Sequence, residues 1–372
     1  MHRLTVVQLL PALQSGGVER STLEIAAALV RAGHRAVVVS AGGRLVQPLL
    51  EAGGEHLTLE IGRKSLLTLR HVVGLRRLFT ELGADIVHAR SRLPAWLGWY
   101  ALRGMPQVAR PRFVTTVHGL NSPSRYSAVM TYGERVICVS QTVRDYVCTH
   151  YPQTDTTRLR TIPRGVDIAQ FPRRPRPDHR ARKWAQTLLS GLPADAPAPL
   201  LLLPGRGTRL KGHADGLQLL ADVRAAGVPA WLWLPGAREP GREAYVRELE
   251  AEAARLGVAE AVAFTEPTAR IAEAYAASDL VLQLSRKPEA FGRTVVEALS
   301  VGRPVLGWAH GGVGELLAEL QPAGAVPAFD AQALSTQALN MLQQAQTPPA
   351  ALPYTLQAMQ SATLKVYDEL RR

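Results

Sequence analysis

The chain has 372 residues, of which 47% are apolar, and its mean hydropathy is close to zero. That composition fits a water-soluble protein with enough apolar side chains for two hydrophobic cores, and typical domain sizes predict two domains. No apolar run approaches the roughly 18 residues that a membrane-spanning helix requires, which argues against an integral membrane protein.

The net charge of +12 is concentrated in the N-terminal half. Residues 1–172 contain 21 Lys and Arg against 11 Asp and Glu, residues 173–183 contain 6 against 1, and residues 184–372 contain 16 against 19. A basic surface attracts anionic partners such as nucleic acid, acidic lipid or a phosphorylated glycan, and general solubility is the alternative explanation. We expect no nucleic-acid partner, because no nucleic-acid-binding motif accompanies the charge and only 6% of the residues are aromatic.

The N-terminal run Leu4–Leu10 is short and contains Gln8, so it predicts a first strand rather than a signal peptide. The two cysteines, Cys138 and Cys148, form no metal-binding pattern. We therefore expect a reducing, cytoplasmic location, with peripheral attachment to the inner face of the cytoplasmic membrane as an open alternative.

Short apolar runs alternate with helical patterns along the whole chain. In the N-terminal half, strands are predicted at Leu4–Leu10, Ala36–Ser40, His56–Leu59, Asp85–His88, Arg112–Val117, Arg135–Val139 and Leu159–Ile162. In the C-terminal half, they are predicted at Pro199–Leu203, Ala230–Leu234, Ala261–Phe264, Leu280–Leu284, Pro304–Gly307 and Ala325–Pro327. Helices are predicted between them, for example at Val18–Arg31, Leu66–Leu82, Thr142–His150 and Arg293–Val301, and at Tyr354–Leu370. Strands that alternate with helices predict parallel sheets with helices on both faces.

A Pro- and Arg-rich segment, Phe171–Pro177, interrupts this alternation. Its three prolines and three arginines favour a surface linker over a core element. We therefore predict an α/β protein with two doubly wound, Rossmann-like domains, residues 1–172 and 184–353, joined by a basic linker at residues 173–183. In such proteins ligands bind outside the C-terminal ends of the strands, in the cleft between the domains.

The segment Glu289-Ala-Phe-Gly-Arg-Thr-Val-Val-Glu297 follows a predicted strand and begins a predicted helix. Backbone N–H groups at a helix N-terminus bind anions, so the amides of Phe291, Gly292 and Arg293 are candidates to contact a phosphate. Glu297, about one turn into the helix, is placed to accept hydrogen bonds from a ribose, and Glu289 to accept them from a sugar. Together they predict a site for a nucleotide diphosphate sugar, although acidic residues near helix N-termini are also common for electrostatic reasons alone.

Two glycine-containing loops are further candidates. Gly16 and Gly17, before the first predicted helix, allow a ligand to approach the backbone closely or simply form a tight turn. Arg206 and Lys211 follow the strand Pro199–Leu203, where two cations can clamp a diphosphate and stabilise negative charge on a leaving nucleotide. The spacing matches neither a Walker loop nor the dinucleotide fingerprint, and a solvated basic turn is the alternative.

His88 and His118 each end a predicted strand. We take His118, which precedes Gly119, as a candidate to hydrogen-bond a hydroxyl, with a structural role as the alternative. The sequence contains no Asp-x-Asp, the carboxylate pair that commonly holds a metal to a nucleotide sugar. We therefore expect no metal cofactor, with Arg206 and Lys211 supplying the positive charge instead.

Taken together, these features resemble the retaining GT-B glycosyltransferases of glycosyltransferase family four, over nearly the whole chain. The resemblance rests on Gly16–Arg20, His118-Gly119, Arg164–Asp167, Gly205-Arg206 with Lys211, Glu289–Glu297, and Gly302–Val305 with Gly311-Gly312. It implies that residues 184–353 bind the nucleotide-sugar donor, residues 1–172 bind the acceptor, and the last helix, residues 354–372, crosses back to the first domain.

The resemblance also implies roles for single residues and a reaction course. Catalytic roles are implied for His118, Arg206, Lys211 and Glu289. Donor binding is implied for Gly16, Gly17, Arg206, Lys211, Glu289, Phe291, Gly292 and Glu297. Transfer then proceeds with retention of configuration, the leaving phosphate acts as the base, and a UDP-sugar is the favoured donor.

Some positions depart from the family pattern, and they leave the donor's identity open. Arg164 stands where family members often carry Asn, and Arg286–Pro288 follows Ser285 where a proline is usual. The segment Ala89–Trp96 is similar to bacterial transferases that build lipopolysaccharide, so we expect an anionic, lipid-linked or lipopolysaccharide-core acceptor.

Two further questions stay open at this point. Trp96, Trp99 and Tyr100 are candidates for membrane contact, with a place in a core helix as the alternative. The remaining alternatives for function are the same fold with a soluble sugar or sugar-phosphate acceptor, and a non-catalytic protein that binds nucleotide sugars or nucleic acid.

Overall fold

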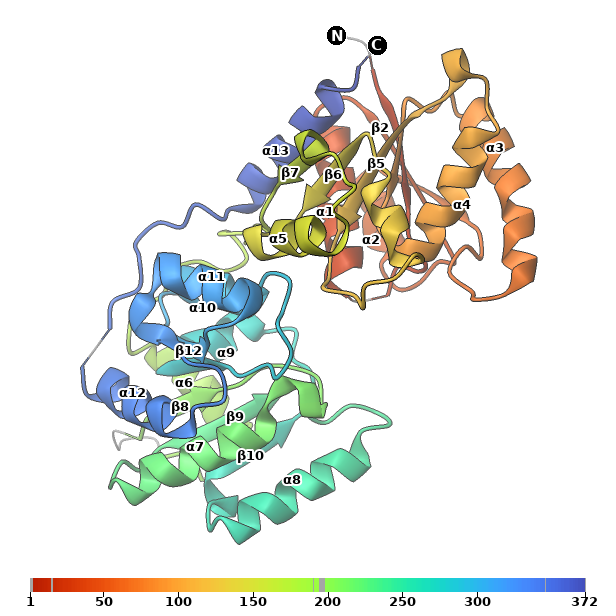
Figure 1. Cartoon of the computed structure of the whole chain (residues 1–372). Coiled ribbons are helices and arrows are strands. Elements are labelled where there is room, and N and C mark those ends of the chain that lie inside the picture. Colours follow the sequence, from red (N-terminus) through yellow and green to blue (C-terminus); the bar gives the residue numbers. More distant parts are fainter. Residues whose placement is uncertain (1–2, 15, 190, 194–197, 345, 372) are drawn as a thin grey trace. The chain divides into compact units, whose positions relative to one another are not determined.

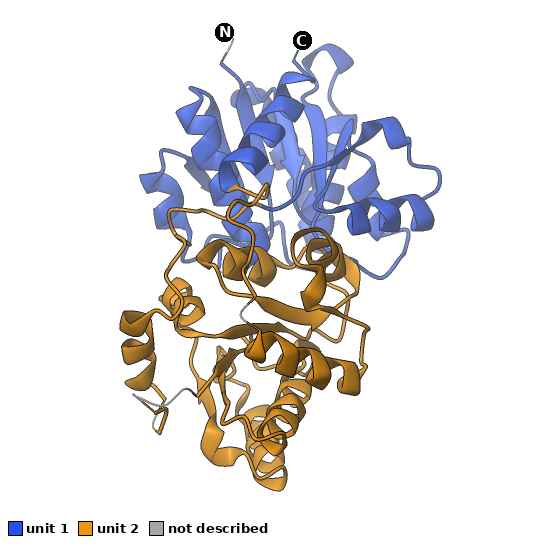
Figure 2. Ribbon diagram, turned by 90° about the vertical axis from the view of Figure 1, so that its left-hand side faces the viewer, with its two compact units in different colours: residues 1–164, 356–372 blue, residues 165–355 orange. Residues whose placement is uncertain are grey.

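The computed structural model describes residues 3–14, 16–189, 191–193, 198–344 and 346–371. It divides into two compact units, shown in blue and orange in Figure 2. Unit 1 comprises residues 1–164 and 356–372, and unit 2 comprises residues 165–355. Each unit contains a parallel sheet flanked by helices, so the prediction of two Rossmann-like α/β domains is confirmed.

In unit 1, seven parallel strands lie in the order β3-β2-β1-β4-β5-β6-β7. They are β1 (Thr5–Leu9), β2 (Arg35–Ser40), β3 (Glu55–Thr58), β4 (Ile86–Ala89), β5 (Arg112–Val117), β6 (Arg135–Cys138) and β7 (Leu159–Thr161). The central strands are buried on both faces, which is why the sequence shows them as nearly continuous apolar runs. The strand order reverses between β1 and β4, and such a switch point is where doubly wound sheets bind ligands.

The helices of unit 1 also follow the predicted pattern, with one difference. They are α1 (Gly17–Arg31), α2 (Val46–Glu51), α3 (His71–Glu81), α4 (Arg92–Arg103), α5 (Gln141–His150) and α13 (Leu356–Asp368), with short 3-10 turns between several of them. The helix expected at Leu66–Leu82 begins instead as a separate 3-10 turn, η1 (Leu66–Arg70), before α3. The Ser65 hydroxyl accepts a hydrogen bond from the Leu67 amide and so caps this turn.

The C-terminal helix α13 belongs to unit 1, as expected. It packs against α1, and Met359, Val366, Tyr367 and Leu370 join the hydrophobic core beneath it. In Figure 1 the blue chain returns from unit 2 to lie beside the red and yellow elements of unit 1. Leu4 and Leu370, which lie far apart in the sequence, therefore belong to the same core.

In unit 2, six parallel strands lie in the order β10-β9-β8-β11-β12-β13. They are β8 (Leu200–Leu202), β9 (Trp231–Pro235), β10 (Val262–Thr265), β11 (Leu280–Gln283), β12 (Val305–Trp308) and β13 (Ala325–Val326). The helices are α6 (His179–Gln186), α7 (His213–Ala225), α8 (Glu243–Arg255), α9 (Ile271–Ala277), α10 (Arg293–Val301), α11 (Gly311–Leu320) and α12 (Ala331–Gln343). Here the strand order reverses between β8 and β11.

The segment expected to be a basic linker, residues 173–183, is instead part of unit 2, and its last five residues begin α6. Asp178 caps this helix by accepting a hydrogen bond from the Ala181 amide. The fully buried Arg303 guanidinium donates hydrogen bonds to the carbonyl oxygens of Arg174 and Pro175, and to that of Ala276 at 2.6 Å. A buried cation therefore holds the proline-rich segment against the end of α9, which a local composition argument does not foresee.

No helix in the part of the chain that the structure describes combines the length and the apolar character needed to cross a lipid bilayer.

Candidate functional site

The predicted donor-binding residues of unit 2 gather at the C-terminal ends of β8 and β11, on either side of the switch point. The loop after β8 contains Arg206 and leads through a 3-10 turn, η5 (Arg209–Lys211), into α7. The loop after β11 contains Glu289 and leads into α10. The Arg286 amide donates a hydrogen bond to the Leu210 carbonyl at 2.8 Å, so the two loops are joined directly.

Lys211 and Glu289 form an ion pair, with 2.6 Å between Nζ and Oε1. The Ser285 hydroxyl also donates to Glu289 Oε1 at 2.6 Å, and Gln283 Nε2 donates to Oε2 at 3.3 Å. Both side chains of the ion pair are partly exposed, at 32% for Lys211 and 24% for Glu289. The pair is therefore preorganised by its surroundings and still open to a ligand.

Glu297 lies in the second turn of α10, where its carboxylate is held on two sides. The Tyr275 hydroxyl donates to Oε2 at 3.0 Å, and Arg293 Nε lies 3.9 Å from Oε1. The glutamate side chain is only 12% exposed. A carboxylate fixed in this way can accept hydrogen bonds in a defined direction, which is what recognition of a vicinal diol requires.

The N-terminus of α10 is built around Gly292. This residue has φ of 100°, a conformation that favours glycine, and a Cβ there would lie 2.8 Å from Val313 Cγ2. The amides of the first turn of α10 have no partner four residues earlier in the helix, so this end suits an anion. Phe291 is buried, and its ring meets that of Tyr354 edge-on at 5.8 Å between centroids.

Gly311 and Gly312, which are among the residues that carry the family resemblance, pack against the Glu289 loop. The Gly312 amide donates to the Glu289 carbonyl at 2.8 Å, and a Cβ on Gly312 would lie 2.5 Å from Phe291 Cα. His310 Nε2 lies 2.8 Å from the Ser285 carbonyl oxygen and ties the same two loops together. The glycine pair thus sets the position of the loop that carries Glu289.

Arg206, unlike Lys211, is not held by an ion pair among the described residues. Its side chain is exposed, and among the described residues no hydrogen bond or ion pair holds it. It lies four residues beyond the end of β8, on the same loop as Lys211. The structure therefore places Arg206 within the loop predicted for the diphosphate, while Lys211, Glu289 and Glu297 are the residues it holds in a fixed arrangement.

In unit 1, the predicted residues lie at the C-terminal ends of β1 and β5. Gly16 is the N-cap of α1 and Gly17 its first residue. A Cβ on Gly17 would meet no atom within 4 Å, so packing inside the chain does not by itself demand glycine there. His118 directly follows β5, and its Nδ1 accepts a hydrogen bond from the Arg164 guanidinium.

His88, which was expected at the end of a strand just as His118 was, is fully buried inside unit 1. Its Nδ1 lies 2.7 Å from the Tyr367 hydroxyl on α13, and its Nε2 lies 2.7 Å from the Thr116 hydroxyl. Both ring nitrogens are satisfied by the protein, so His88 is a structural residue that joins α13 to the sheet.

Three histidines make the fold sensitive to acid: His88 and His213 are fully buried, and His118 is partly exposed. Burial holds the pKa of His88 and of His118 well below the usual range, with nearby arginines acting in the same direction, and burial beside Lys211 lowers that of His213 to about 4. The folded chain keeps these rings neutral, whereas the unfolded chain protonates them below pH 6.5, so acid favours unfolding.

We therefore expect the unfolding free energy to fall as the pH is lowered from 7 to 5, by up to about 2 kcal/mol for each such histidine. Urea unfolding at both pH values measures this loss. His88→Gln should flatten the pH dependence, and the exposed His150→Gln is the matched control. An equally steep dependence in His88→Gln and wild type would contradict the expectation.

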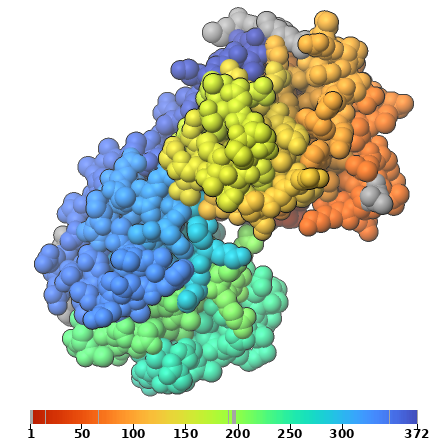
Figure 3. All heavy atoms as spheres, viewed as in Figure 1, coloured from red at the N-terminus to blue at the C-terminus, as the bar shows by residue number. Residues whose placement is uncertain are grey.

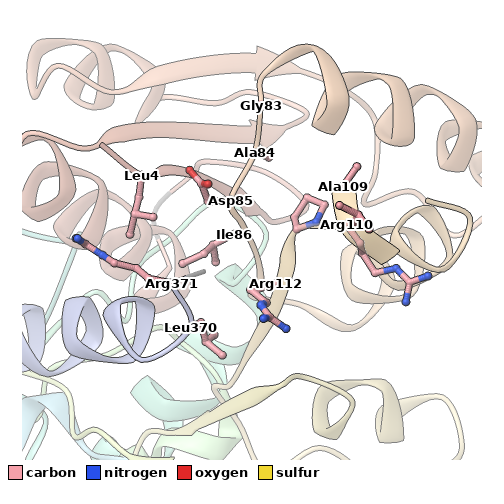
Figure 4. A pocket seen from close by; sticks show the side chains of 12 residues that line it. Leu4, Gly83, Ala84, Asp85, Ile86, Ala109, Arg110, Arg112, Leu370 and Arg371 are labelled. Atoms are coloured by element: carbon pink, nitrogen blue, oxygen red, sulfur yellow. The ribbon is translucent and has the colours of Figure 1, made fainter. Parts of the chain in front are cut away.

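A hollow of about 310 Å³ lies elsewhere, at the N-terminal ends of β1, β4 and β5 in unit 1. Figure 4 shows Arg110, Arg112 and Arg371 around it, together with Asp85. Arg112 pairs with Glu134 at 2.8 Å, and Arg371 with Asp368 at 2.7 Å. Arg112 and Arg371 are therefore already compensated, and none of the predicted site residues lines this hollow.

Comparison with known proteins follows the same division of the chain. Residues 15–170 match the family model described as Glycosyltransferase Family 4, and residues 190–351 match the model described as Glycosyl transferases group 1. The crystal structure of a glycosyltransferase from Rickettsia africae superposes with a TM-score of 0.83 and 25% identity, covering 100% of this chain and 99% of that one. The chain is a GT-B glycosyltransferase.

Other relatives of this glycosyltransferase have named ligands or acceptors. A D-inositol 3-phosphate glycosyltransferase from Xylanimonas cellulosilytica is 29% identical over 80% of this chain and 76% of its own length. One of the same name from Segniliparus rotundus is 28% identical over 62% of this chain, which spans 52% of that relative. The Anabaena protein HepE, solved in complex with UDP and glucose, has a TM-score of 0.76 and 22% identity, with coverage of 99% and 96%.

Three contacts in the site were not found from the sequence. The Glu297 carboxylate of the glycosyltransferase accepts a hydrogen bond from Tyr275, and the Glu289 carboxylate accepts hydrogen bonds from Gln283 and Ser285. Gln283 and Ser285 lie at the end of β11, where a polar residue in an apolar strand is a usable signal. Tyr275 lies on α9 in a run of alanines, and nothing local marks it.

Proposed function

We propose that the enzyme transfers a sugar from a nucleotide diphosphate sugar to an anionic, lipid-linked glycan such as a lipopolysaccharide core, with retention of configuration. Two observations carry the donor half: the ion pair of Lys211 with Glu289 in the loop before α10, and the Glu297 carboxylate held within α10. This arrangement offers a cation and helix amides to a diphosphate, and two oriented carboxylates to hydroxyl groups. A UDP-sugar is the first donor to test, because a structural neighbour was solved with UDP and glucose.

The proposed chemistry assigns the negative charge of the leaving diphosphate to Lys211 and Arg206, without a metal ion. Lys211 changes its partner from Glu289 to the phosphate when the donor binds. Glu289 is then free to accept hydrogen bonds from the transferred sugar while Ser285 and Gln283 keep it in place. The departing phosphate oxygen takes the proton of the acceptor hydroxyl on the same face of the sugar, which gives retention.

The acceptor half of the proposal rests on charge and on an aromatic cluster of unit 1. The rings of Trp96, Trp99, Tyr100 and Tyr132 contact one another at centroid distances of 5.0 to 5.7 Å. Tyr100 is 45% exposed, and Arg103 lies over the Trp99 ring at 4.7 Å. The region of α3 and α4 is orange in Figure 3 and is exposed on that face. Aromatic rings combined with arginine suit the interface of an anionic membrane.

A soluble sugar phosphate is the second candidate acceptor, because the Xylanimonas relative is named for inositol 3-phosphate. Sedimentation with anionic and with neutral vesicles separates the two candidates. Salt-sensitive binding to anionic vesicles alone, reduced by Trp99→Ala with Arg103→Ala, supports the lipid-linked acceptor. Absence of vesicle binding at low salt favours the soluble one.

The donor site is tested by a thermal-shift titration with UDP, GDP, ADP and CMP in the absence of metal. A ligand that binds only the folded protein stabilises it and so raises the melting temperature. At a concentration of 100 times its Kd, the stabilisation is about 2.7 kcal/mol. We expect one diphosphate to raise the melting temperature of the wild type, and the rise to be strongly reduced in Glu297→Gln.

The matched control for that titration is Glu273→Gln, which removes a more exposed carboxylate on neighbouring α9. It should leave the nucleotide response unchanged. An undiminished response in Glu297→Gln would remove Glu297 from the donor site, and no response to any nucleotide in the wild type would count against the donor site as a whole.

A further inference from the structure

Arg164 makes a contact that fixes the chemistry of His118. It follows β7 and is 9% exposed, and its guanidinium donates hydrogen bonds to the Ser21 hydroxyl on α1 and to His118 Nδ1 after β5. Ser21 also accepts a hydrogen bond from Arg90 at 2.7 Å and is fully buried. Arg164 is thus anchored on one side while its other side faces the histidine.

The direction of the hydrogen bond determines where the imidazole carries its proton. A guanidinium has only donors, so His118 Nδ1 must be without a hydrogen. In the neutral ring the hydrogen is then on Nε2. A hydrogen on Nδ1 would set two N–H groups against each other, and protonation of both ring nitrogens would place a second cation beside Arg164.

The other charged groups around His118 act in the same direction. The positive charges of Arg164 and Arg90, together with nearby His88, disfavour the imidazolium form in addition to burial, and all of them lower the pKa of His118. Arg90 itself is 3% exposed and bonded to Gln8 at 2.9 Å.

The second ring nitrogen is left for another molecule. His118 Nε2 is buried, and among the described residues it has no hydrogen-bond partner. A buried N–H donor without an acceptor costs about 1–3 kcal/mol, so its presence calls for an explanation.

We propose that Arg164 is a positioning residue that holds His118 as the neutral Nε2–H tautomer, so that His118 donates a hydrogen bond to an oxygen of the bound sugar or phosphate and does not act as a general base. The tautomer follows from contacts within unit 1 alone. The use of the N–H for a ligand oxygen rests on the proposed function. Arg164 occupies the position at which the sequence departs from the resembled family, so the device belongs to this chain's own residues.

The test is long-range ¹H–¹⁵N NMR of the full-length protein labelled at histidine, because the spectrum distinguishes a protonated ring nitrogen from a bare one. His118→Gln assigns the His118 signals among the 10 histidines. In the wild type we expect a protonated Nε2 and a bare Nδ1, with no titration between about pH 5.5 and 7.5, which is the range within roughly one unit of the ordinary histidine pKa. In Arg164→Met we expect the second tautomer to appear and titration to enter this range, whereas Arg164→Lys, which still donates, keeps the wild-type pattern.

Arg35→Met is the matched control, since Arg35 belongs to the same unit but pairs with Glu55 at 2.7 Å. A wild-type His118 protonated at Nδ1, or an Arg164→Met spectrum identical to wild type, overturns the proposal. If Arg164→Met does not fold, Arg164→Gln takes its place as the variant without the positive charge, and its spectrum is compared with that of Arg164→Lys. These spectra need no ligand, so a failed nucleotide titration would not affect the tautomer result. Equally, an unexpected tautomer would not affect the evidence for nucleotide binding.

Discussion

Lys211→Met is expected to lower kcat for sugar transfer by about 10²–10³, the usual loss when a preorganised group that stabilises developing negative charge is removed. The lysine is held at the donor loops by an ion pair, with its Nζ 2.6 Å from Glu289 Oε1. Methionine keeps the length and apolar stem of the side chain but supplies no charge to the leaving diphosphate. Initial rates with the donor selected by the nucleotide titration measure the effect.

The fold should survive this change, because Glu289 keeps two hydrogen-bond donors, Ser285 and Gln283. Arg209→Met is the matched control: Arg209 lies in the same 3-10 turn, but it pairs with Glu248 and is 71% exposed. We expect its kcat to stay within a factor of about two of wild type, since exposed ion pairs contribute little. If Lys211→Met and Arg209→Met lose the same amount of activity, Lys211 has no special part in the reaction.

Arg303→Met is expected to destabilise unit 2 by roughly 3 kcal/mol or more, because it leaves several buried carbonyl groups without a donor. Arg303 is fully buried and contacts the carbonyls of Ala276, Arg174 and Pro175, as well as those of Val301 and Gly302 at the end of α10. Burial, together with the nearby charge of Arg176, lowers its pKa to about 10, so the guanidinium remains charged at neutral pH.

The measurement is hydrogen exchange with mass spectrometry together with urea unfolding. The Arg174 amide donates to the Val301 carbonyl at 3.1 Å, so peptides around residues 170–178 should lose protection first in Arg303→Met. Arg173→Met is the control, since Arg173 binds the carbonyls of Pro348 and Pro349 from a more exposed position. Equal protection of this segment in Arg303→Met and wild type would show that Arg303 does not hold it.

The sequence predicts the sheets well because parallel strands are buried on both faces. Runs such as Leu200–Leu203 and Val281–Leu284 contain almost only apolar residues, so periodicity and the glycine-containing loops locate them and the loops that follow. The contact between Lys211 and Glu289 follows from the same rule, since the C-terminal ends of β8 and β11 are neighbours.

Long-range pairings could not be predicted in this way. The contact from Arg164 to His118 spans 46 residues and that to Ser21 spans 143, and no local pattern marks any of the three as partners. The segment 173–183 is highly charged and rich in proline, which favours a linker, yet Arg303 and the Asp178 cap fix it within unit 2. The composition of a segment indicates whether it favours contact with water. The position of residues 173–183 in the fold is instead set by Arg303, a buried partner far along the chain.

The position of α13 has a consequence for synthesis on the ribosome. The core of unit 1 uses Met359, Val366, Tyr367 and Leu370, and His88 in the middle of its sheet hydrogen-bonds Tyr367. Although residues 1–164 are made first, that core stays incomplete until the last helix has left the exit tunnel. Unit 2, whose residues are continuous in the chain, is complete earlier. In the nascent protein, the apolar side chains of unit 1 that pack against α13 therefore stay uncovered until residues 356–370 have been made.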